Sequence, residues 1–245
     1  MRLTSLLAAT TLCAAPALAE DVAYTVDGQA FTGYWAAADS PRGTVLIVHD
    51  WDGMTDYERR RADMLAEMGY NAFALDMFGD ATPTETMDHR RAATGALYGD
   101  RARMRALLQA GADAALARAG DGGMVVMGYC FGGAVALEMA RSDMAGMAAG
   151  YASFHGGLDT PEGQRWDGDE PPVLVLHGAA DSSITMADVA GFATEMEAAG
   201  ATYTIEVYSG APHAFTVFGS NRYQERADRE SWAAFTRFLG ERLAM

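Results

Sequence analysis

A cysteine between glycines is the feature that most constrains the fold of this chain. The segment Gly128-Tyr129-Cys130-Phe131-Gly132-Gly133 follows a short apolar run at residues 124–127 and precedes a helical pattern. A sharp turn from a strand into a helix leaves no room for a side chain at Gly128 or Gly132, because it would collide with the neighbouring strand or helix. The segment therefore predicts a strand, a tight turn that pushes Cys130 outward, and a helix, which is the context of a nucleophile elbow.

The rest of the chain alternates short apolar runs with helical patterns. An opening hairpin is expected over residues 22–36, and polar loops over residues 76–87 and 159–172. Further strands are predicted at 44–48, 70–75, 148–153, 173–176 and 202–208, and helices at 56–68, 101–119, 133–140, 186–199 and 223–243. Strands that alternate with helices of this length form a mainly parallel central sheet with helices on both faces. The expected fold class is α/β.

Length and charge limit the domain count and the partners. A chain of 245 residues with 50% hydrophobic residues can bury one large core, so a single catalytic domain is expected over residues 20–245. The formal net charge is −15. Such an acidic protein is not expected to bind nucleic acid.

The N-terminus reads as a secretory signal peptide over residues 1–19. A basic residue precedes an apolar stretch at residues 3–12, and Ala17-Leu18-Ala19 forms a small-residue cleavage motif. The stretch is too short to span a bilayer, so an exported, periplasmic protein without a membrane anchor is expected. Cleavage would remove Cys13 and leave Cys130 as the single thiol, which excludes an intramolecular disulfide.

Two further residues complete a catalytic constellation with Cys130. Asp181 follows the predicted strand at 173–176, where an aspartate either caps the next helix or serves in a site. His213 follows the predicted strand at 202–208, so it lies at the same edge of the sheet. The chain order of nucleophile, acid and histidine is that of the hydrolase triad and favours the catalytic interpretation. In it His213 takes the thiol proton, and Asp181 fixes the histidine tautomer.

Backbone groups near the predicted turn are expected to assist. The N–H of Phe131 follows the nucleophile and would donate to an acyl oxyanion, with the N–H of Trp51 as the second donor. The start of a helix at Cys130 adds partial positive charge, which favours the thiolate.

The remaining candidates have structural interpretations. No histidine or cysteine spacing suggests a metal site. We expect His49 and His177 to be architectural, His155 to border the pocket, His89 to lie on the surface, and Arg59, Arg60 and Arg61 to be mostly solvated.

Four blocks of sequence resemble the dienelactone hydrolase family of the α/β-hydrolase superfamily. They are Val48-His49-Asp50-Trp51-Asp52-Gly53, the cysteine turn at Gly128 to Gly133, His177-Gly178 with Asp181, and His213-Ala214-Phe215. The resemblance covers essentially the whole chain after the leader and implies the α/β-hydrolase fold. It also implies hydrolysis of a small ester or lactone through an acyl-enzyme thioester, without cofactor or metal.

The sequence departs from the family pattern at two positions. Family members carry a glutamate where this chain has Asp50, and that glutamate contacts the cysteine and helps to activate it when substrate binds. Members that cleave dienelactone hold the substrate carboxylate with an arginine where this chain has Val217, although Arg90, Arg91 or Arg222 could replace that contact from a loop.

The expected protein is a monomeric carboxymethylenebutenolidase-like hydrolase acting on a small-molecule ester or lactone. Two alternatives stay open. A catalytically idle binding protein would keep the scaffold and bind a ligand without turnover, and a thioesterase or peptidase would use the same triad on another acyl group.

Overall fold

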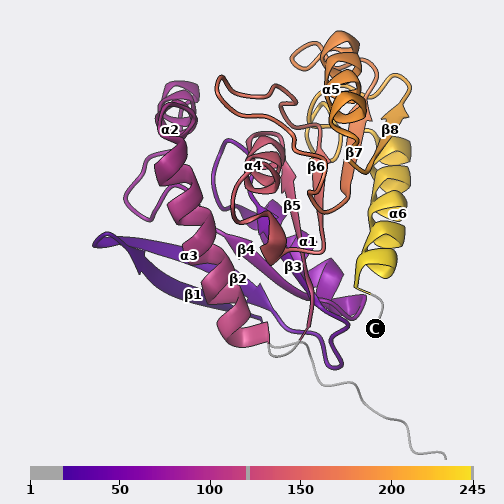
Figure 1. Ribbon diagram of the computed structural model, residues 1–245. Helices are drawn as coiled ribbons and strands as arrows, with labels where there is room; N and C mark the ends of the chain where they lie inside the picture. Colours follow the sequence, from indigo (N-terminus) through magenta and orange to yellow (C-terminus); the bar gives the residue numbers. More distant parts are fainter. Residues whose placement is uncertain (1–18, 120–121, 244–245) are drawn as a thin grey trace, which may run out of the picture.

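An eight-stranded sheet runs through the protein, whose computed structural model describes residues 19–119 and 122–243 (Figure 1). The strand order is β1-β2-β4-β3-β5-β6-β7-β8; β1 and β2 form an antiparallel hairpin, β2 is antiparallel to β4, and all other neighbours are parallel. The strands are β1 (Ala19–Val26), β2 (Gln29–Ala36), β3 (Thr44–Val48), β4 (Asn71–Leu75), β5 (Met124–Tyr129), β6 (Gly150–Phe154), β7 (Val173–Gly178) and β8 (Tyr203–Tyr208). The predicted mainly parallel sheet is confirmed.

Helices cover both faces of the sheet and bury two separate cores (Figure 1). The first core contains side chains of α3 (Arg101–Ala119), α4 (Phe131–Ala140) and α5 (Met186–Ala199), and the second those of α1 (Asp56–Glu67) and α6 (Glu225–Arg242). The sequence of strand β3 is apolar throughout because the strand is covered on both faces. Its alternate side chains point to opposite faces, so Leu46 enters the first core and Ile47 the second.

One helix is missing from the sequence prediction. Residues after the expected loop form α2 (Met87–Gly99), which packs on α3 near the C-terminal edge of the sheet. Only Leu97 of this helix is buried, so the apolar periodicity that usually indicates a helix is weak. The one sequence signal for this helix is a threonine at its start, a residue type that favours the N-cap position. Thr86 is the N-cap residue, and its hydroxyl accepts the N–H of His89 at 3.1 Å.

Arg61 corrects a prediction about helix α1. It was expected in solvent beside Arg59 and Arg60, but it is 1% exposed and forms an ion pair with Asp228. Its guanidinium also donates to the carbonyl of Thr216 at 3.0 Å. The partner that makes burial of this charge possible lies far away in the sequence, on α6.

The predicted signal peptide lies outside the described residues, apart from Ala19, which begins β1. Among residues 19–119 and 122–243, none of the helices has the length and apolar character needed to cross a bilayer.

Candidate active site

The cysteine turn has the strained geometry expected of a nucleophile elbow. Cys130 joins β5 to α4 with φ = 50° and ψ = −110°, a backbone conformation that is costly for a residue with a side chain. The turn is anchored because the N–H of Cys130 donates to the carbonyl of Phe154 on β6 at 3.0 Å. The side chain therefore projects from the C-terminal edge of the sheet.

The two flanking glycines are required for steric reasons, as predicted. A Cβ atom at Gly128 would overlap the backbone of Gly132 in α4. At Gly132 a Cβ would overlap the carbonyl of Val48 and would lie 2.6 Å from the carbonyl oxygen of His49. The first turn of α4 thus packs directly on β3 and β5.

The structure brings the three predicted triad residues together. His213 Nδ1 lies 2.8 Å from Asp181 Oδ2, and His213 Nε2 lies 3.1 Å from Cys130 Sγ. A carboxylate can only accept, so Nδ1–H of His213 donates to Asp181 and Nε2 is free to accept the thiol proton. This is the arrangement in which a histidine can act as general base for a thiol.

Asp181 is held in its ionised form by its surroundings. Burial opposes ionisation, but the hydrogen bonds from His213 and from the backbone N–H groups of Ile184 and Ser183 outweigh it and lower the pKa of the carboxyl. His177 stabilises the same loop because its Nε2–H donates to the carbonyl of Ile184 at 3.0 Å. An ionised, fixed Asp181 can stabilise the imidazolium of His213.

Cys130 is a neutral thiol in the resting structure, although its place at the start of a helix favours the thiolate. Burial raises the pKa of Cys130 well above its usual value, and the charge and hydrogen bond of Asp50 raise it further, whereas the N–H of Phe131 lowers it. The partial positive charge of the helix start is therefore too weak to ionise the sulfur by itself. Cys130 rests as a neutral thiol between His213 and Asp50.

Asp50 keeps the contact with the cysteine although it is shorter than the family glutamate. Burial, together with the charge of Asp52, raises the pKa of Asp50 to about 6, while the N–H of Trp51 and the thiol of Cys130 oppose this rise. The Trp51 N–H donates to Asp50 Oδ1 at 2.5 Å. In the resting structure this N–H, predicted as an oxyanion donor, is therefore engaged by Asp50.

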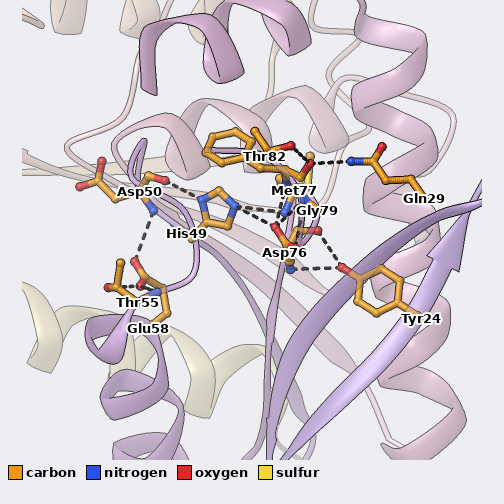
Figure 2. Close-up of polar contacts among 11 residues, drawn as sticks. Tyr24, Gln29, His49, Asp50, Thr55, Glu58, Asp76, Met77, Gly79 and Thr82 are labelled. Carbon is orange, nitrogen blue, oxygen red and sulfur yellow. Dashed lines mark hydrogen bonds and ion pairs between the residues drawn. The ribbon is translucent and has the colours of Figure 1, made fainter. Parts of the chain in front are cut away.

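Buried polar residues position the Asp50 segment (Figure 2). The Glu58 carboxylate accepts both the N–H and the hydroxyl of Thr55, at 3.0 and 2.7 Å, and faces the N–H of Asp50 at 3.4 Å. His49 accepts the N–H of Met77 at Nε2, so its Nδ1–H donates to the carbonyl of Asp50. His49 thus ties the ends of β3 and β4 together, which is the architectural role expected of it.

Phe131 is the better placed of the two predicted oxyanion donors. Its N–H faces Cys130 Sγ, the atom from which a tetrahedral intermediate would extend. The N–H of Trp51 becomes available only when Asp50 releases it. Two such donors are the usual requirement for stabilising an acyl oxyanion.

A cavity of about 610 Å³ opens over the triad. Its lining includes Cys130 and His213, with apolar walls from Trp51, Tyr98, Phe131 and Ile184 and charged groups from Asp159, Arg101 and Arg222. The volume lies within the range of cavities that bind small organic molecules.

Several residues of the cavity wall are not marked by any sequence pattern, among them Tyr98 and Arg101. Tyr98 and Arg101 come from the unpredicted helix α2 and the start of α3, and no motif marks either of them. Of the three arginines that could replace the family contact at position 217, Arg222 lines the cavity, whereas Arg90 donates to the carbonyl of Thr84 and Arg91 forms an exposed ion pair. The Arg222 guanidinium forms no ion pair with any residue of the described ranges.

The other histidines do not form a metal site. Within the part of the chain that the structure describes, no group of three or more His, Cys, Asp or Glu side chains is arranged to hold a metal ion. His89 is on the surface beside Glu85, as expected. His155 does not line the cavity; it is fully buried behind His213.

The sheet, the elbow and the order of the three side chains define an α/β-hydrolase. The chain belongs to the Dienelactone hydrolase family, whose profile matches residues 31–243. It is a hydrolase by this membership.

Known relatives are similar over most of the chain. A Salmonella typhimurium protein provisionally named carboxymethylenebutenolidase is 27% identical over 218 residues, covering 84% of this chain and 80% of its own. A dienelactone hydrolase-like promiscuous phosphotriesterase from metagenomic libraries is 28% identical with a TM-score of 0.83, covering 93% of this chain and 99% of its own. Esterase 2 of Thermogutta terrifontis, 19% identical with a TM-score of 0.62 over 91% and 94% of the two chains, shares the fold.

Proposed function

We propose that this protein hydrolyses small carboxylic esters or lactones with Cys130 as the nucleophile. The observation that carries the proposal is the continuous contact from Asp181 through His213 to the sulfur of Cys130, at 2.8 and 3.1 Å, on the floor of a substrate-sized cavity. Three residue types with complementary tasks meet there in the order that acyl transfer needs.

The first half-reaction forms a thioester. His213 Nε2 takes the thiol proton while Sγ of Cys130 attacks the carbonyl carbon, and the carbonyl oxygen becomes an oxyanion that accepts the N–H of Phe131. The intermediate then expels the alcohol or enol oxygen, which takes the proton from His213. Because the resting thiol is neutral, this proton transfer accompanies the attack instead of preceding it.

The second half-reaction returns the enzyme to its resting state. His213 takes a proton from water as the water oxygen attacks the thioester carbonyl of acyl-Cys130. The C–S bond breaks, the carboxylic acid leaves, and the proton on His213 returns to the sulfur.

Two arginines in the cavity favour substrates that carry a carboxylate. Arg101 is paired at 3.4 Å with buried Glu138, which also accepts ion pairs from Arg105 and Arg141, so the positive charge around this carboxylate is only partly neutralised. Arg222 stands at the mouth without an ion pair among the described residues. These groups can attract an anionic ester into an acidic protein.

A substrate panel tests the proposal. We expect hydrolysis of small esters and lactones, with KM for carboxylate-bearing members raised about tenfold in Arg222→Ala and unchanged for neutral ones, as for loss of one charge-assisted contact. Arg91→Ala, which removes an exposed arginine outside the cavity, is the matched control. Preference for a thioester or a phosphotriester within the panel would change the substrate class, and tight binding without turnover of any member would instead establish the idle binding protein.

The role of Asp50 gives a separate prediction. Asp50→Asn is expected to increase the rate at which iodoacetamide alkylates Cys130 at pH 7 by severalfold, because the charge of Asp50 raises the pKa of the thiol. Below about pH 6 Asp50 is protonated in the wild type, so the difference between the two proteins should shrink there. Asp88→Asn, which changes an exposed carboxylate, serves as control. Equal alkylation rates across the pH range would show that Asp50 does not restrain the thiol.

A further inference from the structure

His155 lies at a point where the backbone cannot shift easily. It follows β6 with φ = 42°, and its N–H donates to the carbonyl of Leu176 in β7 at 2.9 Å. The preceding carbonyl, of Phe154, accepts the N–H of Cys130. A fully buried residue in this strained conformation is held by the same strand end that holds the nucleophile.

The ring of His155 packs against the ring of the catalytic base. The ring centroids of His155 and His213 are 5.2 Å apart, with an angle of 65° between the ring planes. The ring of Phe215 also packs on His155, with 5.4 Å between the centroids. The Asp181 hydrogen bond fixes one atom of His213 but leaves rotation about that bond. A ring packed edge to face restricts this rotation and so helps to aim Nε2 at the sulfur.

A chain of hydrogen bonds holds the ring of His155. Arg61 Nε can only donate, and it donates to the Tyr57 hydroxyl at 3.2 Å. The hydroxyl oxygens of Tyr57 and Thr216 lie 2.7 Å apart, and the Thr216 hydroxyl lies 2.9 Å from His155 Nε2. His155 Nδ1 is buried without a hydrogen-bond partner among the described residues. The hydrogen bond to Thr216 therefore fixes the orientation of this ring.

The surroundings keep His155 neutral at every stage of the reaction. Burial lowers its pKa well below the usual value, and a positive charge on His213 lowers it further, although Asp181 opposes this. Arg61, at the far end of these hydrogen bonds, is itself buried, and its positive charge is paired with Asp228. The imidazolium of His213 thus forms beside a neutral neighbour.

We infer that His155 is a positioning residue for His213, held against its ring by the hydrogen-bond relay from Arg61 through Tyr57 and Thr216. The inference rests on the proposed function only in giving His213 the role of base. The ring packing and the relay do not depend on any substrate.

The state of His155 can be read directly. Long-range ¹H–¹⁵N correlation spectra of histidine-labelled protein, assigned with the His155→Phe variant, are expected to show a neutral His155 that does not titrate between about pH 5 and pH 8. Thr216→Val should shift the Nε2 resonance of His155, and Thr216→Ser should restore it. A charged or titrating His155 in the wild type, or an Nε2 resonance unmoved in Thr216→Val, would overturn the inference.

The positioning effect is measured in the same variants. Thr216→Val is expected to lower kcat about tenfold with KM little changed, as for a misaligned base. Thr216→Ser should recover most of the loss, and Thr194→Val, which removes a hydroxyl on the exposed face of α5, should have no effect. Wild-type kcat in Thr216→Val, or equal losses in the valine and serine variants, would contradict a role for the relay.

Failure of the proposed function would be recognised separately. If the wild type hydrolyses no ester or lactone, the rate of Cys130 alkylation replaces kcat as the readout of how well His213 accepts the thiol proton. Thr216→Val should then slow alkylation severalfold, with recovery in Thr216→Ser. An unchanged alkylation rate would overturn the positioning role.

Discussion

Cys130→Ala is expected to lower kcat/KM for the best ester or lactone by about 10⁴-fold or more, the usual cost of removing a catalytic nucleophile. No other side chain can take over, because Cys130 alone has its reactive atom within 3.1 Å of His213 Nε2 among the described residues. The residual rate should come from the cavity and the Phe131 N–H. Initial rates measured over a range of substrate concentrations give the number.

A stability measurement accompanies this variant. Truncating one partly buried sulfur should change the free energy of unfolding by only about 1 kcal/mol, since the site borders an open cavity. Urea unfolding followed by tryptophan fluorescence checks that the alanine protein is folded. Undiminished turnover by folded Cys130→Ala would remove the cysteine mechanism altogether.

Gly132→Ala is expected to destabilise the protein by about 3 kcal/mol or more, at the upper end of overpacking effects. The new methyl group would overlap the carbonyl of Val48, and its neighbours are backbone atoms of β3, which cannot move aside as a flexible side chain can. Relief would require α4 to separate from the sheet, which also misplaces Cys130. The midpoint of urea unfolding measures the loss.

Gly191→Ala is the matched control for the glycine prediction. Gly191 is an exposed position in α5 where an added Cβ meets nothing within 4 Å, so alanine should leave stability unchanged or raise it slightly through helix propensity. Equal stability of Gly132→Ala and the wild type would mean that the elbow is less tightly packed than the structure describes.

The sheet and the triad were predictable because they depend on local patterns and on one topological rule. The apolar run before Gly128 and the glycines around Cys130 specify a strand, a turn and a helix without any knowledge of their neighbours. Parallel strands deliver their C-terminal ends to a single edge, so Asp181 and His213 had to lie near that cysteine.

The features that sequence reasoning missed depend on contacts between distant segments. Arg61 is buried because Asp228 on α6 pairs with it, and no local pattern of α1 indicates that partner. Helix α2 buries only Leu97, so no apolar pattern in the sequence indicated the helix that brings Tyr98 to the cavity. The resting thiol is neutral because burial and Asp50 together outweigh the helix start, a balance that only the assembled site fixes.

The relay behind His213 illustrates the same point at finer scale. His155, Thr216, Tyr57 and Arg61 come from three separate parts of the chain, and their hydrogen bonds form only once all four are in place. Each residue is ordinary in the sequence. Together they form a polar network that joins α1, the end of β6 and the segment before α6 inside the core.

The central claim is that the acyl group passes through a covalent bond to Cys130, and trapping that bond tests it most directly. The wild type would be mixed rapidly with p-nitrophenyl acetate, quenched in acid and analysed by intact-protein and peptide mass spectrometry. The account predicts one acetyl group, attached to the peptide that contains Cys130, formed at the rate of the nitrophenol burst and absent from Cys130→Ala. Steady hydrolysis with no acetylated protein at any quench time, or acetylation of a different residue that turns over at the catalytic rate, would contradict it.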